Sequence, residues 1–457
     1  MWRKIQVDLE EWSRRKGRKP LILRGARQVG KTWLVREFAK QRFENCVEIN
    51  FDQNPEKADL FVSRDVEEIV RLLEVDMEVD IRPGKTVLFL DEIQSVPDVI
   101  PLLRYFFENM PALHVIAAGS LLEFVLSEHT FSMPVGRIEY LFMGPMSFSE
   151  FLAAHGKENL CRFLSTYQLG DPLPRSIHET LLKFLKTYCV VGGMPAAVQA
   201  YVDRGDVRLS SREHLSILQT YRDDFSKYGK RIDIQRLGRV FDAIPLQVGR
   251  KLKYVNLDPN ERAKPLADCV EMLEMARVIY CVTHSAGNGV PLGAESRLKD
   301  RKPLFLDVGL LCSALGLKAT DFHLEADLTL VNKGAVAEQF AGQHLLYRGE
   351  SYAEPTLYYW NREQRSSSAE VDYLLTYGSQ IVPVEIKAGK VGSLKSLHVF
   401  VSEKGSPFAV RFNTDVPSRC IATSAVASKP SQPFELISLP LYLVEELPRL
   451  FQCLEKP

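Results

Sequence analysis

Short apolar runs alternate with helical patterns between Pro20 and Ser120. The runs predict strands, at residues 21–23, 47–49, 87–90 and 113–117. The segments between them predict helices, at 32–42, 65–73 and 99–109. Strands that alternate with helices in this way are typical of a parallel sheet whose faces are covered by helices.

Other patterns precede and follow this region. Trp2, Ile5, Leu9 and Trp12 recur at helical spacing and predict a docked amphipathic helix; acidic neighbours make membrane attachment the weaker hypothesis. Residues 150–201 and 212–317 are mainly helical in pattern. Further elements are expected after them: helices at 335–346 and 443–450, and strands at 356–360, 370–376, 381–386 and 434–439.

Composition narrows the class of protein. The 457 residues include 58 Lys and Arg against 58 Asp and Glu, so the formal net charge is zero, and a polycation that coats nucleic acid is excluded. None of the eight cysteines forms a CxxC pair, and the nine histidines lack metal-ligand spacing, which disfavours zinc sites. There is no pattern of a signal peptide and no apolar run of the ~20 residues that a membrane helix needs. We therefore expect a cytoplasmic protein that makes no membrane contact.

The strongest chemical signal follows the first predicted strand. The sequence Gly25-Ala26-Arg27-Gln28-Val29-Gly30-Lys31-Thr32 matches the GxxxxGK[ST] phosphate-binding loop in its required strand–loop–helix setting. Glycines let backbone N–H groups converge on phosphate oxygens, and the following helix adds the partial positive charge of its N-terminus. In such a loop, Lys31 reaches the β- and γ-phosphates, and the Thr32 hydroxyl ligates Mg²⁺.

Acids and a serine end the strands that should flank this loop. Asp91 closes a buried strand and is expected to hold Mg²⁺ through water. Glu92 follows it and is the candidate catalytic base, which orients and polarises the attacking water. Ser120 ends the next strand, where it either senses the γ-phosphate or the attacking water, or only opens the following turn. Because no NKxD sequence follows, guanine is disfavoured and the expected ligands are ATP and Mg²⁺.

Taken together, these motifs resemble those of the AAA-type predicted ATPases of bacteria and archaea that carry a C-terminal domain of unknown function. The resemblance covers nearly the whole chain through shorter motifs, at 119–120, 136–137, 145–151, 192–195, 307–311 and 370–373. It implies an α/β protein with an AAA-type parallel sheet. We expect a P-loop ATPase domain at 1–150, a helical lid at 151–211, a winged-helix-like domain at 212–320 and a PD-(D/E)XK nuclease-like α/β domain at 321–457.

Two of the shorter motifs gain a role from the resemblance. Arg137 sits where such ATPases present an arginine finger, in cis or from a neighbouring subunit; the alternative is an internal salt bridge with Glu139 or another acid. In Gly193-Met194-Pro195, the family's GxP pattern places the helical lid over the nucleotide; the alternative is a plain turn between helices.

The middle of the chain is locally basic. Nine basic residues and four acids lie between Arg222 and Lys253. Helices followed by a hairpin, with arms expected at 278–282 and 291–292, outline a winged helix. A basic winged helix contacts the phosphates of DNA, whereas the alternative is a solvated surface on an interdomain module.

The C-terminal strands carry a second set of acids. Asp372 lies on one predicted strand and the Glu385-x-Lys387 pair on the next, so a hairpin brings them together on one face. Two carboxylates that ligate Mg²⁺ and a lysine that activates water are similar to the PD-(D/E)XK nuclease pattern, in which Glu338 matches the helical acid. The alternative is a salt-bridged sheet without nuclease chemistry.

Two hypotheses for the whole protein follow. The first is an ATPase that acts on DNA, with or without metal-dependent cleavage. The second is an ATPase switch, as a homo-oligomer or with a protein partner, whose nuclease-like domain is an inactive scaffold. A steep fall of DNA affinity with salt is expected only for the first.

Overall fold

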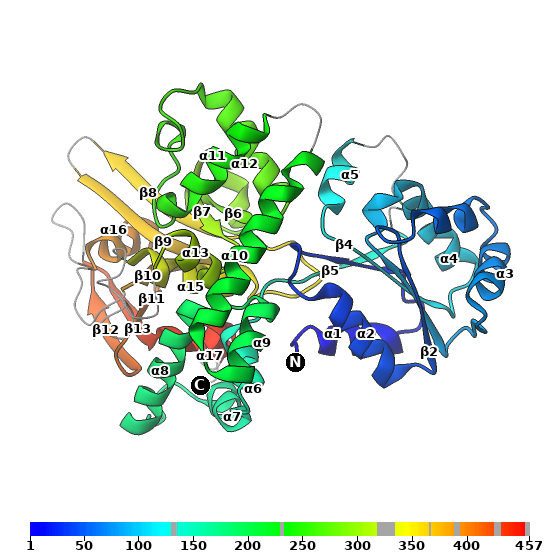
Figure 1. The fold of residues 1–457 in the computed structure, drawn as a ribbon. Coiled ribbons are helices and arrows are strands. Elements are labelled where there is room, and N and C mark those ends of the chain that lie inside the picture. The colour runs from blue at the N-terminus through cyan, green and yellow to red at the C-terminus, as the bar shows by residue number, and fades with distance from the viewer. Residues whose placement is uncertain are drawn as a thin grey trace.

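In this computed structural model, the described residues are 1–128, 134, 136–228, 233–317, 334–364, 367–387, 394–424 and 431–452. They contain two β-sheets, one of five and one of eight strands. The two sheets lie in separate lobes on opposite sides of the molecule, as Figure 1 shows. Among the described residues, no helix combines the length and the apolar character that a bilayer crossing needs.

The N-terminal lobe is built on a parallel sheet, as predicted. Its strands are β1 (Leu21–Arg24), β2 (Asn45–Asn50), β3 (Thr86–Asp91), β4 (His114–Gly119) and β5 (Glu139–Phe142), in the order β2-β3-β4-β1-β5. Its helices are α1 (Gln6–Arg14), α2 (Lys31–Arg42), α3 (Val66–Met77), α4 (Leu103–Asn109) and α5 (Leu122–Glu128), with shorter turns at Pro55–Phe61, Ile93–Ser95 and Pro97–Leu102. The four strands predicted before residue 120 are confirmed, whereas the short edge strand β5 was not predicted.

Alternation along the central strands explains why this sheet is covered on both faces. Val87 and Phe89 pack into one apolar core, and Leu88 and Leu90 pack into another on the opposite face. The first core also takes up the fully buried Trp12 of α1, so the expected docked N-terminal helix is confirmed.

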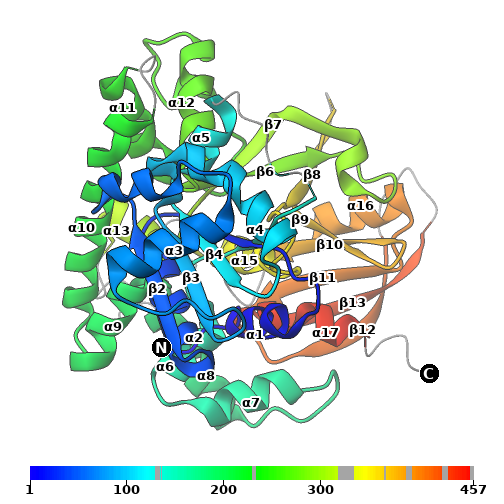
Figure 2. The same cartoon turned by 90° about the vertical axis from the view of Figure 1, so that its right-hand side faces the viewer.

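Helices follow the sheet, as expected. They are α6 (Phe148–Ala154), α7 (Glu158–Thr166), α8 (Arg175–Val191), α9 (Pro195–Arg204) and α10 (Val207–Asp224). The start of α6 is fixed by a capping box in which the Ser147 hydroxyl accepts from the Glu150 N–H and the Glu150 carboxylate accepts from the Ser147 N–H. Figure 2 shows α9 and α10 beside the N-terminal lobe.

The middle segment contributes helices and a hairpin. The helices are α11 (Ile234–Ala243), α12 (Ala263–Met275) and α13 (Val308–Ala314), and the antiparallel hairpin is β6 (Ile279–Ser285) with β7 (Ser296–Phe305). The first arm is confirmed, but the second arm expected at 291–292 is wrong, because Leu292 begins a 3-10 turn, Leu292–Glu295. β7 was missed because Arg297, Lys299 and Asp300 interrupt any apolar pattern in its first half.

The C-terminal segment completes the second sheet. Its elements are α15 (Ala335–Leu346), β8 (Tyr358–Gln364), β9 (Ser367–Tyr377), β10 (Gln380–Ile386), α16 (Lys395–Lys404), β11 (Phe408–Asn413), β12 (Ser418–Thr423), β13 (Pro433–Pro440), a 3-10 turn at Leu441–Glu446 and α17 (Leu447–Gln452). The strand order is β12-β13-β11-β10-β9-β8-β6-β7. Because β6 pairs in parallel with β8, the hairpin of the middle segment continues the C-terminal sheet, and a boundary at 320 divides one sheet.

Candidate nucleotide site and a buried carboxylate cluster

The P-loop connects β1, which lies between β4 and β5 in the N-terminal sheet, to α2. Both of its glycines are required by the backbone. A Cβ on Gly25 would lie 2.2 Å from the Met143 carbonyl oxygen, and Gly30 adopts φ +96°, a conformation that side chains disfavour. Glycine is therefore needed at both positions for the loop to adopt this backbone conformation.

Lys31 lies inside this loop. Its side chain is buried, and Nζ donates to the carbonyl oxygens of Gly25 at 2.9 Å and Ala26 at 2.8 Å. Burial lowers the pKa of Lys31 to about 8, although the nearby Glu92 and Asp91 raise it. The ammonium is thus held at the loop by neutral acceptors, a position from which phosphates would attract it strongly.

The magnesium-binding pair expected from the sequence is in contact. Thr32 Oγ1 donates to Asp91 Oδ2 at 2.9 Å, from the start of α2 to the end of β3. Asn50, which faces Asp91 across the β2–β3 ladder, donates to the same oxygen at 3.2 Å. Burial and the neighbouring Glu92 raise the pKa of Asp91. Asn50 was not predicted, although its place at the end of a predicted strand was a usable signal.

Glu92 and Ser120 also come together. Glu92 Oε2 accepts from Gln94 Nε2 at 2.6 Å and from Ser120 Oγ at 3.3 Å. A Cβ on Gly119 would lie 2.3 Å from Gln94 Oε1, so glycine is needed there for the amide to reach Glu92. The structure therefore places Thr32, Asp91, Glu92 and Ser120 at one edge of the sheet. Gln94 was missed, because a polar residue in a short turn carries no distinctive pattern.

The P-loop backbone is also held from outside the sheet. Arg3 is buried and donates to the carbonyl oxygens of Val29 at 2.9 Å and Gly144 at 2.7 Å, and to Glu150 at 3.0 Å. On the other side, Arg27 pairs with Asp224 at 2.6 Å. Neither contact was predicted, since each joins residues distant in sequence.

The segment around Gly193 reaches the same loop. Its backbone N–H donates to Asp307 Oδ2 at 2.6 Å, and its carbonyl oxygen accepts from Met146 N at 2.7 Å. Burial raises the pKa of Asp307 to about 6, although three backbone N–H groups lower it. Pro195, at the start of α9, lies 3.4 Å from where a Cβ of Gly30 would be. The segment of the GxP pattern therefore lies beside the P-loop, and its role as a lid over the nucleotide stays a prediction.

Arg137 lies on the surface of the N-terminal lobe. Its Nε donates to Glu108 Oε1 at 3.0 Å, and 43% of its side chain is exposed. The ion pair matches the alternative of a salt bridge, with Glu108 in place of Glu139, which pairs with Arg15 instead. Exposure leaves Arg137 accessible to a neighbouring subunit.

In the described part of the middle segment, most cations of the basic stretch are paired with acids. Five of its cations pair with acids: Arg222 with Asp242, Lys227 with Asp224, Arg236 with Asp233 and Glu261, Arg239 with Asp258 and Glu261, and Lys251 with Asp300. Lys230 and Arg231 lie outside the described residues. The surface is therefore less positive than the count of basic residues indicates.

The C-terminal acids converge as the hairpin predicted. Asp372 Oδ2 on β9 accepts from the Ile386 N–H of β10 at 2.7 Å, and Lys387 pairs with Glu385 at 2.5 Å. Glu338 of α15 and Glu370 of β9 join them through a shared partner, Lys302. Burial raises the pKa of Glu338 to about 7 and, together with Asp372, that of Glu385 to about 8. We call Glu338, Glu370, Asp372 and Glu385 the carboxylate cluster.

The donor set does not fit the expected metal centre. In the part of the chain that the structure describes, no group of three or more His, Cys, Asp or Glu side chains is arranged to hold a metal ion. The ammonium of Lys302, on β7, lies among the carboxylates instead, 2.9 Å from Glu370 and 3.2 Å from Glu338. Lys302 was missed because its strand was missed.

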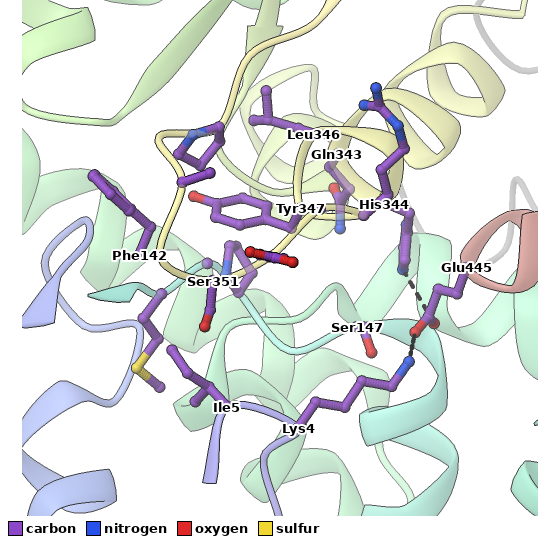
Figure 3. Close-up of a pocket in the computed structure, with 18 of the residues that line it drawn as sticks. Lys4, Ile5, Phe142, Ser147, Gln343, His344, Leu346, Tyr347, Ser351 and Glu445 are labelled. Carbon is purple, nitrogen blue, oxygen red and sulfur yellow. Dashed lines mark hydrogen bonds and ion pairs between the residues drawn. The ribbon is translucent and has the colours of Figure 1, made fainter. Parts of the chain in front are cut away.

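A cavity of about 460 Å³ lies between the two lobes (Figure 3). Lys4 pairs there with Glu445 at 2.5 Å, and His344 lies 3.8 Å from the same carboxylate. Burial alone would raise the pKa of Glu445, but Lys4 and His344 lower it to about 2. The ion pair between Lys4 and Glu445 therefore connects the N-terminal lobe to the C-terminal segment at this cavity.

Comparison with known proteins is consistent with this geometry. Residues 17–152 match the family model of an AAA domain. These residues make up most of the N-terminal lobe, which is therefore similar to an AAA domain. Residues 182–321 and 333–419 match two domains of unknown function, DUF8612 and DUF4143. No curated protein matches the chain in sequence.

Solved structures give weaker similarities. The Aeropyrum pernix ORC2 protein, in ADPNP–ADP complexes, is 13% identical with a TM-score of 0.35, over 61% of this chain and 88% of that one. The Aeropyrum pernix ORC1 protein in complex with DNA is 13% identical with a TM-score of 0.26, over 71% and 95%. PCH-2 of C. elegans is 12% identical with a TM-score of 0.23, over 60% and 67%. Similarities this low support no inference about function.

Proposed function

We propose that this protein binds ATP with Mg²⁺ and hydrolyses it at the P-loop of the N-terminal lobe. The observation that carries the proposal is the hydrogen bond from Thr32 to Asp91 beside the buried Lys31. A hydroxyl and a carboxylate in contact, next to a buried lysine in a glycine-containing loop, match the needs of a magnesium–triphosphate complex.

Each side chain has a definite task in this mechanism. Lys31 leaves its two carbonyl acceptors and neutralises the β- and γ-phosphates. Thr32 and Asp91 would hold Mg²⁺, and the ion would supply positive charge to offset that of the phosphate oxygens. Glu92 orients and polarises the attacking water, and Ser120 and Gln94 fix its carboxylate by hydrogen bonds.

What hydrolysis drives is a separate part of the proposal. Of the two hypotheses from the sequence, the switch with a nuclease-like scaffold is better supported than action on DNA. The basic stretch is largely paired with acids, and the carboxylate cluster pairs with lysine. The contacts of Arg27 with α10 provide a route from the P-loop to the other lobe.

Nucleotide binding is the direct test of the site. Isothermal titration calorimetry should show ATP binding by the wild type and none of comparable strength by Lys31→Ala, because the buried triphosphate loses its main side-chain cation. Lys40→Ala, at an exposed position of the same helix, is the control and should bind normally. Equal affinity of Lys31→Ala and the wild type would remove the assignment.

DNA binding separates the two hypotheses. We expect weak binding of duplex, single-stranded and branched DNA, with a shallow dependence of log K on log[salt], because five of the seven described cations of the basic stretch pair with acids. Incubation with Mg²⁺ or Mn²⁺, with and without ATP, is expected to leave all three DNA forms uncut. A steep salt dependence, or cleavage that Asp372→Asn abolishes, would restore the DNA hypothesis.

A further inference from the structure

A lysine from the middle segment is buried among acids of the C-terminal segment. Lys302 is on β7, and only 3% of its side chain is exposed. Its Nζ lies 2.9 Å from Glu370 Oε1, 3.2 Å from Glu338 Oε2 and 3.7 Å from Asp372 Oδ1. The same atom lies 5.6 Å from the centre of the Tyr359 ring on β8, so the ammonium also contacts the face of this ring. One ammonium thus serves three carboxylates from two elements.

The positive charge among these carboxylates belongs to the chain itself, on Lys302. A buried ammonium is stable only when it is paired, and buried carboxylates need a cation in the same way. The ion pairs of Lys302 supply partners both for its own ammonium and for the carboxylates. Lys387 pairs with the remaining acid, Glu385, from the solvent side.

We propose that Lys302 is the resident cation of the carboxylate cluster: it occupies the acids that would otherwise bind a divalent metal, and so keeps the cluster metal-free. This inference concerns the C-terminal part of the proposed function, in which the nuclease-like fold is a scaffold. It adds a physical reason why the nuclease-like domain would be inactive: Lys302, from the middle segment, pairs with its acids.

The middle segment also covers the cluster from outside. A Cβ on Gly249 would lie 3.2 Å from Glu338 Oε2, so the backbone at Gly249 lies against this acid. The loop after Gly249 is fixed to β7 by a hydrogen bond of 2.7 Å from Leu252 N to the Arg301 carbonyl oxygen, next to Lys302. Displacing Lys302 would therefore require movement of β7 and this loop together.

The test uses the full chain, because β6 and β7 belong to the same sheet as β9. Mn²⁺ without nucleotide is the probe, measured by isothermal titration calorimetry. Wild type and Asp372→Asn should give the same weak titration. Lys302→Gln should gain a site with at least about tenfold higher affinity, since three acids lose their cation. Adding Glu338→Gln to Lys302→Gln should abolish that gain.

Lys299→Gln is the matched control, because Lys299 is exposed on the same strand. It should titrate like the wild type. The inference is overturned if the wild type binds Mn²⁺ at a site that Asp372→Asn removes, or if folded Lys302→Gln gains no site. If Lys302→Gln does not fold, the Mn²⁺ titrations of the wild type and Asp372→Asn still test the inference. ATP binding by wild type and Lys302→Gln, measured in parallel, tests the P-loop assignment separately.

Discussion

Arg27, inside the P-loop, forms an ion pair of 2.6 Å with Asp224, the last residue of α10. The Tyr221 hydroxyl of the same helix donates to the Arg27 carbonyl oxygen at 2.9 Å. The loop that would receive phosphate is therefore fixed, by side chain and backbone, to a helix outside the AAA-type sheet. A change in the conformation of the loop on nucleotide binding would therefore alter its contacts with α10 directly.

The strength of this connection is measurable. Asp224 is nearly buried, so we expect Arg27→Ala and Asp224→Asn to be coupled by about 1 kcal/mol or more in a double-mutant cycle on urea unfolding. Lys227→Ala, which removes the more exposed second partner of Asp224, should change stability by less than about 0.5 kcal/mol. Additive effects of the Arg27 and Asp224 substitutions would show that the pair transmits nothing.

The pH dependence of ATP binding should follow Lys31. Its pKa is about 8 without nucleotide, and phosphates would raise it by favouring the charged form. Affinity should stay level below pH 8 and then fall by up to about tenfold per pH unit, with uptake of one proton on binding. Calorimetry at pH 7, 8 and 9 in two buffers of different ionisation enthalpy measures both quantities. Level affinity with no proton uptake up to pH 9 would contradict the assigned role of Lys31.

The role of Arg137 can be separated from that of its ion pair. If Arg137 acts on the nucleotide of a neighbouring subunit, ATPase activity per molecule should rise with protein concentration, and Arg137→Ala should lose this activity but still bind ATP. Arg104 shares the same Glu108 partner at 3.0 Å, so Arg104→Ala is the control and should keep the activity. ATPase rates that do not depend on protein concentration would contradict action on a neighbouring subunit. Arg137 would then act in cis or only form a surface salt bridge.

Gly193 should be essential for the fold around the lid. A Cβ there would lie 2.1 Å from the Met146 carbonyl oxygen, and backbone groups cannot yield as flexible side chains do. Gly193→Ala should lower the melting temperature by several degrees, as expected for a loss of about 1–3 kcal/mol. Gly238→Ala is the control, because a Cβ at this helical position meets nothing within 4 Å and should be neutral or stabilising. Equal melting temperatures for both variants would contradict the packing described here.

The sequence was most informative where local pattern and chemistry coincide. The P-loop and Asp91 each follow a buried strand, and parallel strands bring their ends together, so the site could be predicted without the structure. Asp372 and Glu385 could be predicted because a hairpin suffices to gather them, whereas Glu338 was indicated only by the resemblance to the nuclease pattern.

The rest depended on contacts between distant segments. Arg3, Arg27 and Lys302 make their important contacts 26 or more residues away, and nothing local distinguishes them from ordinary surface cations. β7 is half polar because it is an edge strand, and β12 is largely exposed, so neither shows the apolar pattern by which strands are predicted. The shared sheet could not be foreseen, since the parallel pairing of β6 with β8 joins segments on either side of an expected boundary.

Hydrolysis by Glu92→Gln tests the central claim most directly. The substitution keeps the shape of the side chain and its contacts with Gln94 and Ser120 but removes the charge that polarises water. We predict that ATP binds with near wild-type affinity and that phosphate release under saturating Mg·ATP slows by at least about 10²-fold. A wild-type rate of phosphate release from this variant would contradict the assignment of Glu92 as the catalytic base, and with it the mechanism proposed for this site.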